Sequence, residues 1–368
     1  MTLDKCYSLF IMKLNRNFAK KLRILNYQQQ LKNLKNFEET PLLQLIPKTP
    51  QNKHLYQNGA SKLIPRLTLK VHSEIEECFY LWEKFSPKKT LFDLWDFCYA
   101  WSEGLNSKLY FYTLYEGKKP LGVLPLSYYD GDKRFEWFGC EWLENHSFFV
   151  EDENIIDLLL TVAPSPLYLN SIAIQKDIEK LAQYGKLSND PDERNIKDIS
   201  NFSSLDELLV TMKKKHRYNL KYDYKRLIKT GVKIEMIKTK DLTLFEEMTE
   251  MNKERFDGVE KDESYVDKFK EAFRQIIKKA NQYDFKYIKV SSPMKTASID
   301  MVFTYNDIYY PATGSNNIVD FNGIGNFMTY IEFEDAINNR FKLVDILQED
   351  HGWKHRYFDK IPLFVFEK

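Results

Sequence analysis

The sequence predicts an α+β protein of two similar domains, each built around a mixed, mostly antiparallel central sheet. The first observation is the length, since 368 residues suffice for two domains of roughly 150 to 200 residues each. The second is composition: hydrophobic residues make up 43% and charged residues 29%, which excludes a disordered or collagen-like chain. The third is a repeated order of elements. A strand, two helices, a three-stranded meander, a helix and a strand occur on both sides of a long helix expected over residues 204–230.

The first copy of this order begins near Leu63. Alternating apolar residues predict a strand over 66–72, and Ser73 can cap the helix that follows it. Turn signals at Glu116-Gly117 and Asp130-Gly131 then separate three strands. The expected elements are helices over 75–82, 92–101 and 153–161, strands over 108–115, 120–129, 134–138 and 167–170, and a polar loop over 185–200.

The second copy follows the helix 204–230, which Gly231 ends as a left-handed cap. Its expected elements are strands over 232–237, 285–290, 297–304, 308–311, 343–347 and 363–366, and helices over 242–256, 265–280 and 325–338. The predicted domains are therefore an N-terminal domain over 63–203 and a C-terminal domain over 204–368 that includes the linking helix.

Residues 1–62 are expected to form a basic helical extension and a linker. Residues 1–40 carry eight Lys and Arg against three acids, with apolar residues at helical spacing over 13–37. Such a helix can bind a membrane surface or a partner, or it can simply pack on the body of the protein.

Overall composition excludes several classes of protein. The chain carries 54 basic and 53 acidic residues, so no global field attracts it to nucleic acid or membrane. No run reaches the roughly 18 apolar residues of a spanning helix, so no integral membrane segment is expected. The four cysteines form no CxxC pair, which predicts neither a zinc site nor a disulfide framework and favours a cytoplasmic setting.

A glycine-containing loop before the helix 325–338 is the clearest site signal. Gly323 and Gly325 let the backbone turn sharply and approach a ligand, and Asn326 follows in the first helical turn. A helix start presents free N–H groups and the positive end of its dipole, which suits a phosphate. The alternative is an ordinary tight turn before a helix.

The helix 213–229 is strongly basic. Arg217, Lys221 and Lys225 are four residues apart and share one face, which could hold the phosphates of an aminoacyl-tRNA or a lipid-linked sugar. The alternative is a solvated helix whose lysines pair with nearby acids.

Titratable residues also gather after the strand 343–347. Asp350 or His351 could act as a base, and Lys354 could bind a carboxylate or phosphate, while an exposed charged turn is the alternative. Tyr310, with Tyr309 before it, could line an acceptor site or pack in the core. No HExxH motif supports a metal, and no nucleophile motif is present, so the acceptor is expected to attack the donor directly.

Three passages agree in order and spacing with a known family. They are Lys215–Lys221 with Gly231 after it, Ile324–Met328 with Ala336 after it, and Asp345–Lys354 with Asp350 and Trp353 inside it. Over roughly residues 66–358 the chain resembles the double-GNAT acyltransferases, a family that includes the FemAB-type peptidyltransferases and FemAB-like envelope proteins. Asp320 stands where the family's CoA-binding loop has Gln or Arg.

The resemblance implies two tandem GNAT-like domains and an acyltransferase. The donor would be acyl-CoA, bound at Gly323, Gly325, Asn326 and Arg217, and the catalytic residues would be Asp350, His351, Lys354 and Tyr310. The implied acceptor is an amine or hydroxyl of a sugar or cell-envelope precursor. The alternatives are an aminoacyl-tRNA-dependent peptidyltransferase of the FemAB type and a non-catalytic binding module on the same fold.

Overall fold

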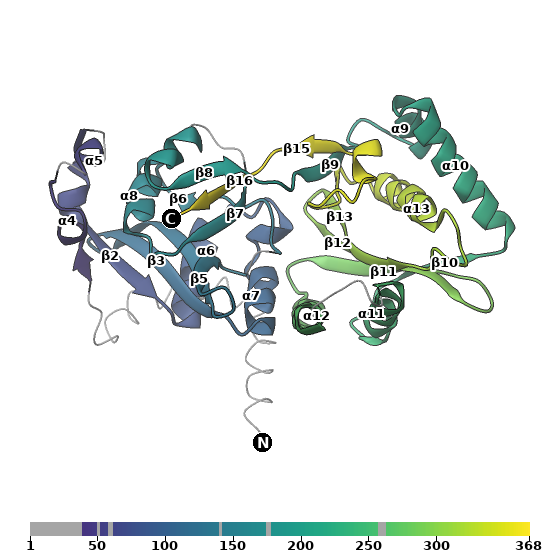
Figure 1. Cartoon of the computed structure of the whole chain (residues 1–368), viewed down its shortest axis with the longest axis horizontal. Helices are drawn as coiled ribbons and strands as arrows, with labels where there is room; N and C mark the ends of the chain where they lie inside the picture. The colour runs from purple at the N-terminus through teal and green to yellow at the C-terminus, as the bar shows by residue number, and fades with distance from the viewer. Residues whose placement is uncertain (1–38, 50–51, 58–61, 140–141, 174–177, 257–262) are drawn as a thin grey trace, which may run out of the picture.

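A computed structural model of the chain describes residues 39–49, 52–57, 62–139, 142–173, 178–256 and 263–368. The helix expected over 13–37 lies outside these residues. Figure 1 shows two α+β halves side by side, each with its own sheet, which confirms the predicted fold class. None of the helices in the described ranges is long and apolar enough to cross a bilayer.

The N-terminal half is built on an antiparallel sheet in the order β1-β2-β3-β4-β5, with β6 also paired to β4. Its strands are β1 (Thr40–Pro41), β2 (Leu67–His72), β3 (Lys108–Glu116), β4 (Lys119–Tyr129), β5 (Arg134–Trp137) and β6 (Phe149–Val150). Its helices are α4 (Leu42–Leu45), α5 (Lys53–Gln57), α6 (Ile75–Phe85), α7 (Trp95–Gly104) and α8 (Asn154–Val162). The predicted meander is confirmed. The second predicted helix begins at Trp95 because residues 91–93 form a separate 3-10 turn, η3 (Leu91–Asp93).

The C-terminal half is built on a seven-stranded sheet in the order β10-β11-β12-β13-β14-β9-β15. Its strands are β9 (Arg194–Asp198), β10 (Lys233–Ile237), β11 (Asp284–Ser291), β12 (Thr296–Tyr305), β13 (Ile308–Asn316), β14 (Leu343–Asp345) and β15 (Asp359–Ile361). Its helices are α9 (Leu205–Thr211), α10 (Lys214–Lys229), α11 (Thr243–Phe256), α12 (Glu263–Lys279) and α13 (Ile324–Asn338). The helices α9, α10 and α13 cover one face of the sheet, and α11 and α12 cover the other (Figure 1).

The prediction of one continuous helix over 204–230 is wrong, because the structure has two helices there. Met212 and Lys213 adopt extended backbone angles, so α9 ends and α10 begins on either side of them. Met212 is partly buried and packs against the hydrophobic cluster that includes residues of α9, α10 and α13. The break therefore follows from a core contact that the helical spacing does not reveal.

The prediction of a polar loop over 185–200 is also wrong, because this segment contains two strands, β8 (Lys186–Asn189) and β9. Their charged side chains pair across the sheet. Lys186 lies 2.8 Å from Glu367, and Lys197 lies 3.1 Å from Asp359. Strands whose side chains form exposed ion pairs lack the apolar alternation by which strands are recognised.

The two halves exchange strands across the predicted boundary at 203/204. β9 precedes that boundary but lies in the C-terminal sheet between β14 and β15. β16 (Phe364–Glu367) follows the whole C-terminal half but pairs with β7 (Tyr168–Ile172) and β8 in the N-terminal half. Each half is therefore completed by a strand from the other side of the boundary.

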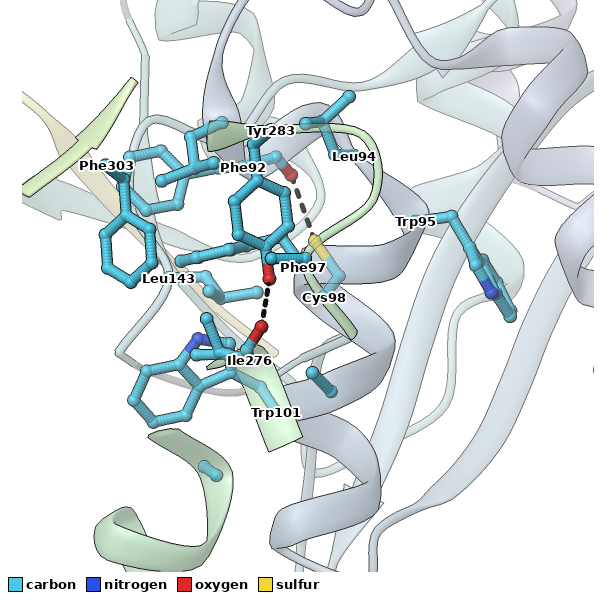
Figure 2. Packing of buried hydrophobic residues seen from close by; sticks show 14 of the residues in the cluster. Phe92, Leu94, Trp95, Phe97, Cys98, Trp101, Leu143, Ile276, Tyr283 and Phe303 are labelled. Carbon is cyan, nitrogen blue, oxygen red and sulfur yellow. Dashed lines mark hydrogen bonds between the residues drawn. The ribbon is translucent and has the colours of Figure 1, made fainter. Parts of the chain in front are cut away.

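One hydrophobic core continues across both halves, where α7 packs against α12 (Figure 2). The ring of Trp101 meets that of Phe273 at 5.2 Å, and the ring of Phe97 meets that of Tyr283 at 5.4 Å. A Cβ on Gly104 would lie 2.5 Å from the Cα of Ala272, so the helices approach as closely as a glycine allows. This shared core fixes the position of the two halves relative to each other.

Candidate functional site

The first feature of the site is the point at which β13 and β14 separate. Their parallel pairing covers only two residue pairs, Ile308 with Leu343 and Tyr309 with Val344. β13 continues to Asn316 with a register irregularity opposite Met301 and Val302 of β12, whereas β14 ends at Asp345. Beyond Tyr310, the β14-facing edge of β13 has no strand partner in the described residues.

The unpaired edge of β13 leads to the start of α13. Gly323 is the N-cap and has a φ of 75°, a left-handed conformation that glycine adopts without strain. A Cβ on Gly323 would lie 2.3 Å from Oδ1 of Asp223, so the carboxylate of this α10 residue lies against it. At Gly325, in contrast, no described atom outside its own helical turn lies within 4 Å of the Cβ position. Among the described residues, the start of α13 is therefore open on the side of Gly325 and closed on that of Gly323.

Asn326 joins the start of α13 to its neighbours. Its Nδ2 donates to Oδ2 of Asp223 at 2.7 Å, and its Oδ1 accepts from the hydroxyl of Tyr357 at 2.9 Å. Arg226 bonds both Asp223 and the carbonyl of Asn322. The loop is thus held from α10 on one side and from the C-terminal turn on the other.

Asp320 points away from this loop. Its carboxylate lies 2.7 Å from Nζ of Lys295 and accepts from Nδ2 of Asn317 at 2.9 Å. Hydrogen bonds from these two residues lower the pKa of Asp320. Its negative charge is therefore paired outside the loop rather than directed at a ligand.

The predicted basic face of α10 is partly occupied. Arg217 donates to the carbonyl of Val210 at 3.3 Å, and Lys221 lies 2.6 Å from Asp206, so both side chains bind α9. Lys225 is exposed. The structure therefore does not bring Arg217 together with Gly325 and Asn326.

Asp350 caps the turn that leads into η5 (Lys354–Arg356). Its Oδ1 accepts from the backbone N–H groups of Gly352, Trp353 and Lys354 at 2.9 to 3.0 Å, and its Oδ2 lies 2.7 Å from Nδ1 of His355. Although burial opposes them, these hydrogen bonds lower the pKa of Asp350 to about 2. A carboxylate held this firmly in its ionised form is a weak base.

The Asp350→Asn variant is expected to unfold more easily at pH 7 than the parent, by about 2 kcal/mol. The folded pKa of Asp350 is below its unfolded value, so its contribution is present above about pH 4 and is lost as the pH falls toward 2. Urea unfolding of both proteins between pH 2 and pH 7 measures the difference in unfolding free energy. A difference that stays constant over that range would contradict the stabilising role assigned to the ionised Asp350 carboxylate.

His351 and Lys354 lie in different environments. The side chain of His351 is 73% exposed and lies 3.3 Å from Glu349. Lys354 is buried, and its ammonium donates to the carbonyls of Ile346 and Gln348 rather than pairing with Asp350. The described ranges contain no group of His, Cys, Asp and Glu side chains that could hold a metal ion.

Lys354 belongs to a largely buried group of titratable side chains between the two halves, which we call the junction cluster. Its members are Glu144, Arg194, Tyr310, Asp345 and Lys354. Nε and Nη2 of Arg194 donate to Oδ2 of Asp345 at 2.8 and 2.6 Å, and the Asp345 residue is fully buried. Burial, together with the charge of Asp345, raises the pKa of Glu144 to about 8. Burial lowers the pKa of Lys354.

Tyr310 lies at the edge of the junction cluster, where β13 and β14 separate. Its hydroxyl oxygen accepts from the N–H of Leu91 at 3.3 Å, and its ring meets that of Phe92 at 6.0 Å. Burial raises the pKa of Tyr310, as does the charge of Asp345. In the described part of the chain, no acceptor binds its hydroxyl hydrogen. Tyr310 is therefore a buried O–H donor without an acceptor, at the junction of the two halves.

The backbone around the junction cluster is strained. Four non-glycine residues there have a φ between 51° and 65°, namely Asn145, Ser171, Leu347 and Glu349. Such conformations persist only where surrounding contacts hold them, and they concentrate at functional sites. At Leu347 the holding contacts come from Asn195, whose backbone N–H and Nδ2 both donate to the Leu347 carbonyl.

Glu144 and Arg194 are not among the predicted site residues. A signal for Glu144 exists, since Glu144 to Ser147 are four polar residues between Leu143 and Phe148. Arg194 lies in a segment with no apolar pattern, and its partner Asp345 is 151 residues away. Only the fold brings them together.

Comparison with solved structures identifies the architecture. FemX aligns with a TM-score of 0.53 at 13% identity, over 81% of this chain and 96% of FemX. A tandem GNAT protein from the clavulanic acid biosynthesis pathway aligns with a TM-score of 0.50 at 10% identity, over 82% of this chain and 98% of that protein. This chain has the tandem GNAT fold.

L-PGS from Bacillus licheniformis also aligns with this chain, with a TM-score of 0.53 at 11% identity over 80% of this chain and 92% of that structure. No protein-family model matches the sequence, and no curated protein matches it. The similarity therefore confirms the predicted fold, and the function must be argued from the site.

Proposed function

We propose that this protein is an acyltransferase that moves an acyl group from acyl-CoA to an amine or hydroxyl of a sugar or cell-envelope precursor. The observation that carries the proposal is the unpaired edge of β13, which begins at Tyr310 and leads to the open start of α13 at Gly325. A donor that has an extended arm followed by phosphates matches this arrangement, with the arm along the edge of β13 and the phosphates at the start of α13.

The donor arm would add to the edge of β13. Strand edges bind extended ligands through their free backbone N–H and C=O groups. The seven residues from Tyr310 to Asn316 span about 20 Å at the usual rise of a strand. The phosphates would then bind the N–H groups at the first turn of α13, on the open side of Gly325. Asp223 blocks the other side, next to Gly323.

The acyl group would lie beside Tyr310. Its hydroxyl hydrogen would donate to the oxyanion that forms when the acceptor attacks the acyl carbon. Glu144, with a pKa of about 8, would take the proton that the acceptor loses, a role for which Asp350 is less suited. The bond between the acyl carbon and sulfur would then break, and CoA would leave as a thiolate that takes up this proton. The positive charge of Lys354 would offset negative charge within the junction cluster.

One observation favours a second candidate, in which the donor is an aminoacyl-tRNA. The exposed face of α10 carries Tyr218 and Tyr222, which are 63% and 52% exposed and stack at 5.7 Å, with Lys214 and Lys215 at its start. Exposed aromatic rings among lysines suit stacking with bases beside a phosphate backbone.

The Gly325→Val variant is expected to bind acyl-CoA at least tenfold more weakly, which corresponds to about 1.4 kcal/mol. Valine would crowd the open side of the helix start, and no described atom outside its own helical turn lies within 4 Å of the new Cβ, so the variant should fold. Titration calorimetry with acyl-CoA measures the change. Gly117→Asn is a matched control, since Gly117 also has open surroundings and asparagine tolerates its φ of 58°.

Unchanged affinity in a folded Gly325→Val protein would remove this loop from the donor site. If the parent binds no acyl-CoA but binds aminoacyl-tRNA, and if Tyr218→Ala with Tyr222→Ala weakens that binding, the second candidate is correct. A protein that binds neither donor would contradict both proposals.

A further inference from the structure

Two neighbouring turns at one end of the C-terminal sheet expose apolar side chains to solvent. We call residues 292–295 and 317–320 the exposed turns. Met294, between β11 and β12, is 92% exposed, and Val319, between β13 and α13, is 90% exposed. Ile318 beside it is 52% exposed. Isolated exposed apolar residues are common, but here three of them occur on adjacent turns.

The exposed turns are held in place by polar contacts. Lys295 of the first turn forms an ion pair with Asp320 of the second at 2.7 Å. The N–H of Asn317 donates to the carbonyl of Ala297 at 2.9 Å, which attaches the second turn to β12. Within the first turn, the N–H of Ser292 donates to the carbonyl of Lys295 at 2.8 Å. The apolar side chains are thus held outward together on two linked turns.

Basic residues lie next to the exposed turns. Arg226 of α10 bonds the carbonyl of Asn322, just after the second turn, and Lys233 of β10 lies opposite Ser291, just before the first. Lys225 and Lys229 are exposed and form no ion pair with any described residue. Figure 1 shows that the end of α10, the start of β10 and the β11–β12 hairpin lie at the same end of the molecule, away from the N-terminal half.

The charges at this end are unbalanced toward positive. Its basic residues are Lys225, Arg226, Lys229, Lys233, Lys289 and Lys295, and its acids are Asp223, Glu235, Glu247 and Asp320. All four acids are engaged by basic residues of the same set, which leaves Lys225 and Lys229 in excess. Apolar side chains on projecting turns and surplus lysines therefore occur together.

We propose that this end of the C-terminal half docks on an anionic lipid surface. Met294, Ile318 and Val319 would enter the interface between headgroups and acyl chains, and Lys225 and Lys229 would lie over the lipid phosphates. Peripheral membrane binding combines these two signals, shallow apolar insertion and attraction to anionic lipid. A stable protein partner would need about 800 Å² on each side, which three side chains on two turns do not provide.

Docking of this kind would also orient the protein. The second exposed turn runs directly into the start of α13, so the loop around Gly325 would lie close to the lipid surface. An acceptor carried by a membrane lipid would then reach the protein by diffusion along that surface. The docking proposal does not depend on the proposed acyl transfer, because vesicle binding needs neither donor nor acceptor.

Sedimentation with vesicles tests the proposal, using phosphatidylcholine alone and phosphatidylcholine mixed with phosphatidylglycerol. The parent protein is expected to bind the anionic vesicles, and less so as salt is raised. The double variant Met294→Ser with Val319→Ser should bind at least tenfold more weakly. Val210→Ser is the matched control, since Val210 is an exposed valine of the same half at 69% exposure and should leave binding unchanged.

A second double variant, Lys225→Gln with Lys229→Gln, separates the two contributions. It should bind anionic vesicles more weakly and with less dependence on salt. The proposal is overturned if the parent does not bind anionic vesicles or if the Met294→Ser/Val319→Ser protein binds them as the parent does. Self-association of the parent that is lost in the Met294→Ser/Val319→Ser protein would also overturn the proposal. The exposed turns would then contact a second copy of the chain.

Discussion

The Tyr310→Phe variant is expected to transfer its acyl group 10²- to 10³-fold more slowly than the parent. Loss of a single oxyanion donor typically has this effect, because the donor is fixed before the charge develops and no water replaces it. Only the rate constant of transfer should fall, and donor affinity should change little, since the bond to the hydroxyl forms in the transition state. Single-turnover kinetics measure the rate constant of transfer, and a binding titration measures the affinity for the donor.

Tyr283→Phe is the matched control for this experiment. Tyr283 lies in the same core, is also buried, and its hydroxyl donates to the carbonyl of Ile276 at 2.7 Å (Figure 2). Each variant loses one buried hydrogen bond, so both should lose about 1 kcal/mol of unfolding free energy. If the two variants also lose the same amount of activity, Tyr310 is structural and the oxyanion role assigned to it is wrong.

The Arg194→Met variant is expected to lose about 3 to 5 kcal/mol of unfolding free energy. The change leaves the carboxylate of Asp345, which has no exposed surface, without the guanidinium that donates two hydrogen bonds to it. Removing one partner of a buried pair strands the other charge, whereas removing both does not. Urea unfolding measures the loss.

The double variant Arg194→Met with Asp345→Leu removes both partners of the ion pair. It should recover most of the unfolding free energy that Arg194→Met loses, because neither charge then remains buried alone. Recovery would show that the pair matters for stability through its balance of charge. A double variant as unstable as Arg194→Met would instead show that the junction needs this ion pair for its geometry.

Apolar patterning accounts for most of the fold that could be predicted. The meander strands of both halves have continuous or alternating apolar residues, and α13 was located from its glycine start. Patterning failed where the stabilising contact is polar and distant. β8 and β9 are held by backbone pairing with strands distant in sequence, and by ion pairs whose partners are more than 150 residues away, so no local signal marks them as strands.

The residues predicted for the site lie only partly together in the structure. Tyr310 and Lys354 were identified from the sequence, and the structure brings both to the junction cluster. Their neighbours Glu144 and Arg194 come from loops and strands placed by topology alone. The role of Asp350 depends on which N–H groups its carboxylate caps, and that is decided by the backbone conformation of residues 350–355 rather than by residue type.

The position of β16 bears on how this protein folds during synthesis. Phe366 is fully buried in the N-terminal core, and β16 lies between β7 and β8 there, yet it follows the whole C-terminal half along the chain. A ribosome must therefore translate all of the C-terminal half before the N-terminal core can close. Until then the emerging N-terminal half exposes apolar surface of the kind that chaperones recognise. Contacts between segments so far apart in sequence also predict slow folding after synthesis.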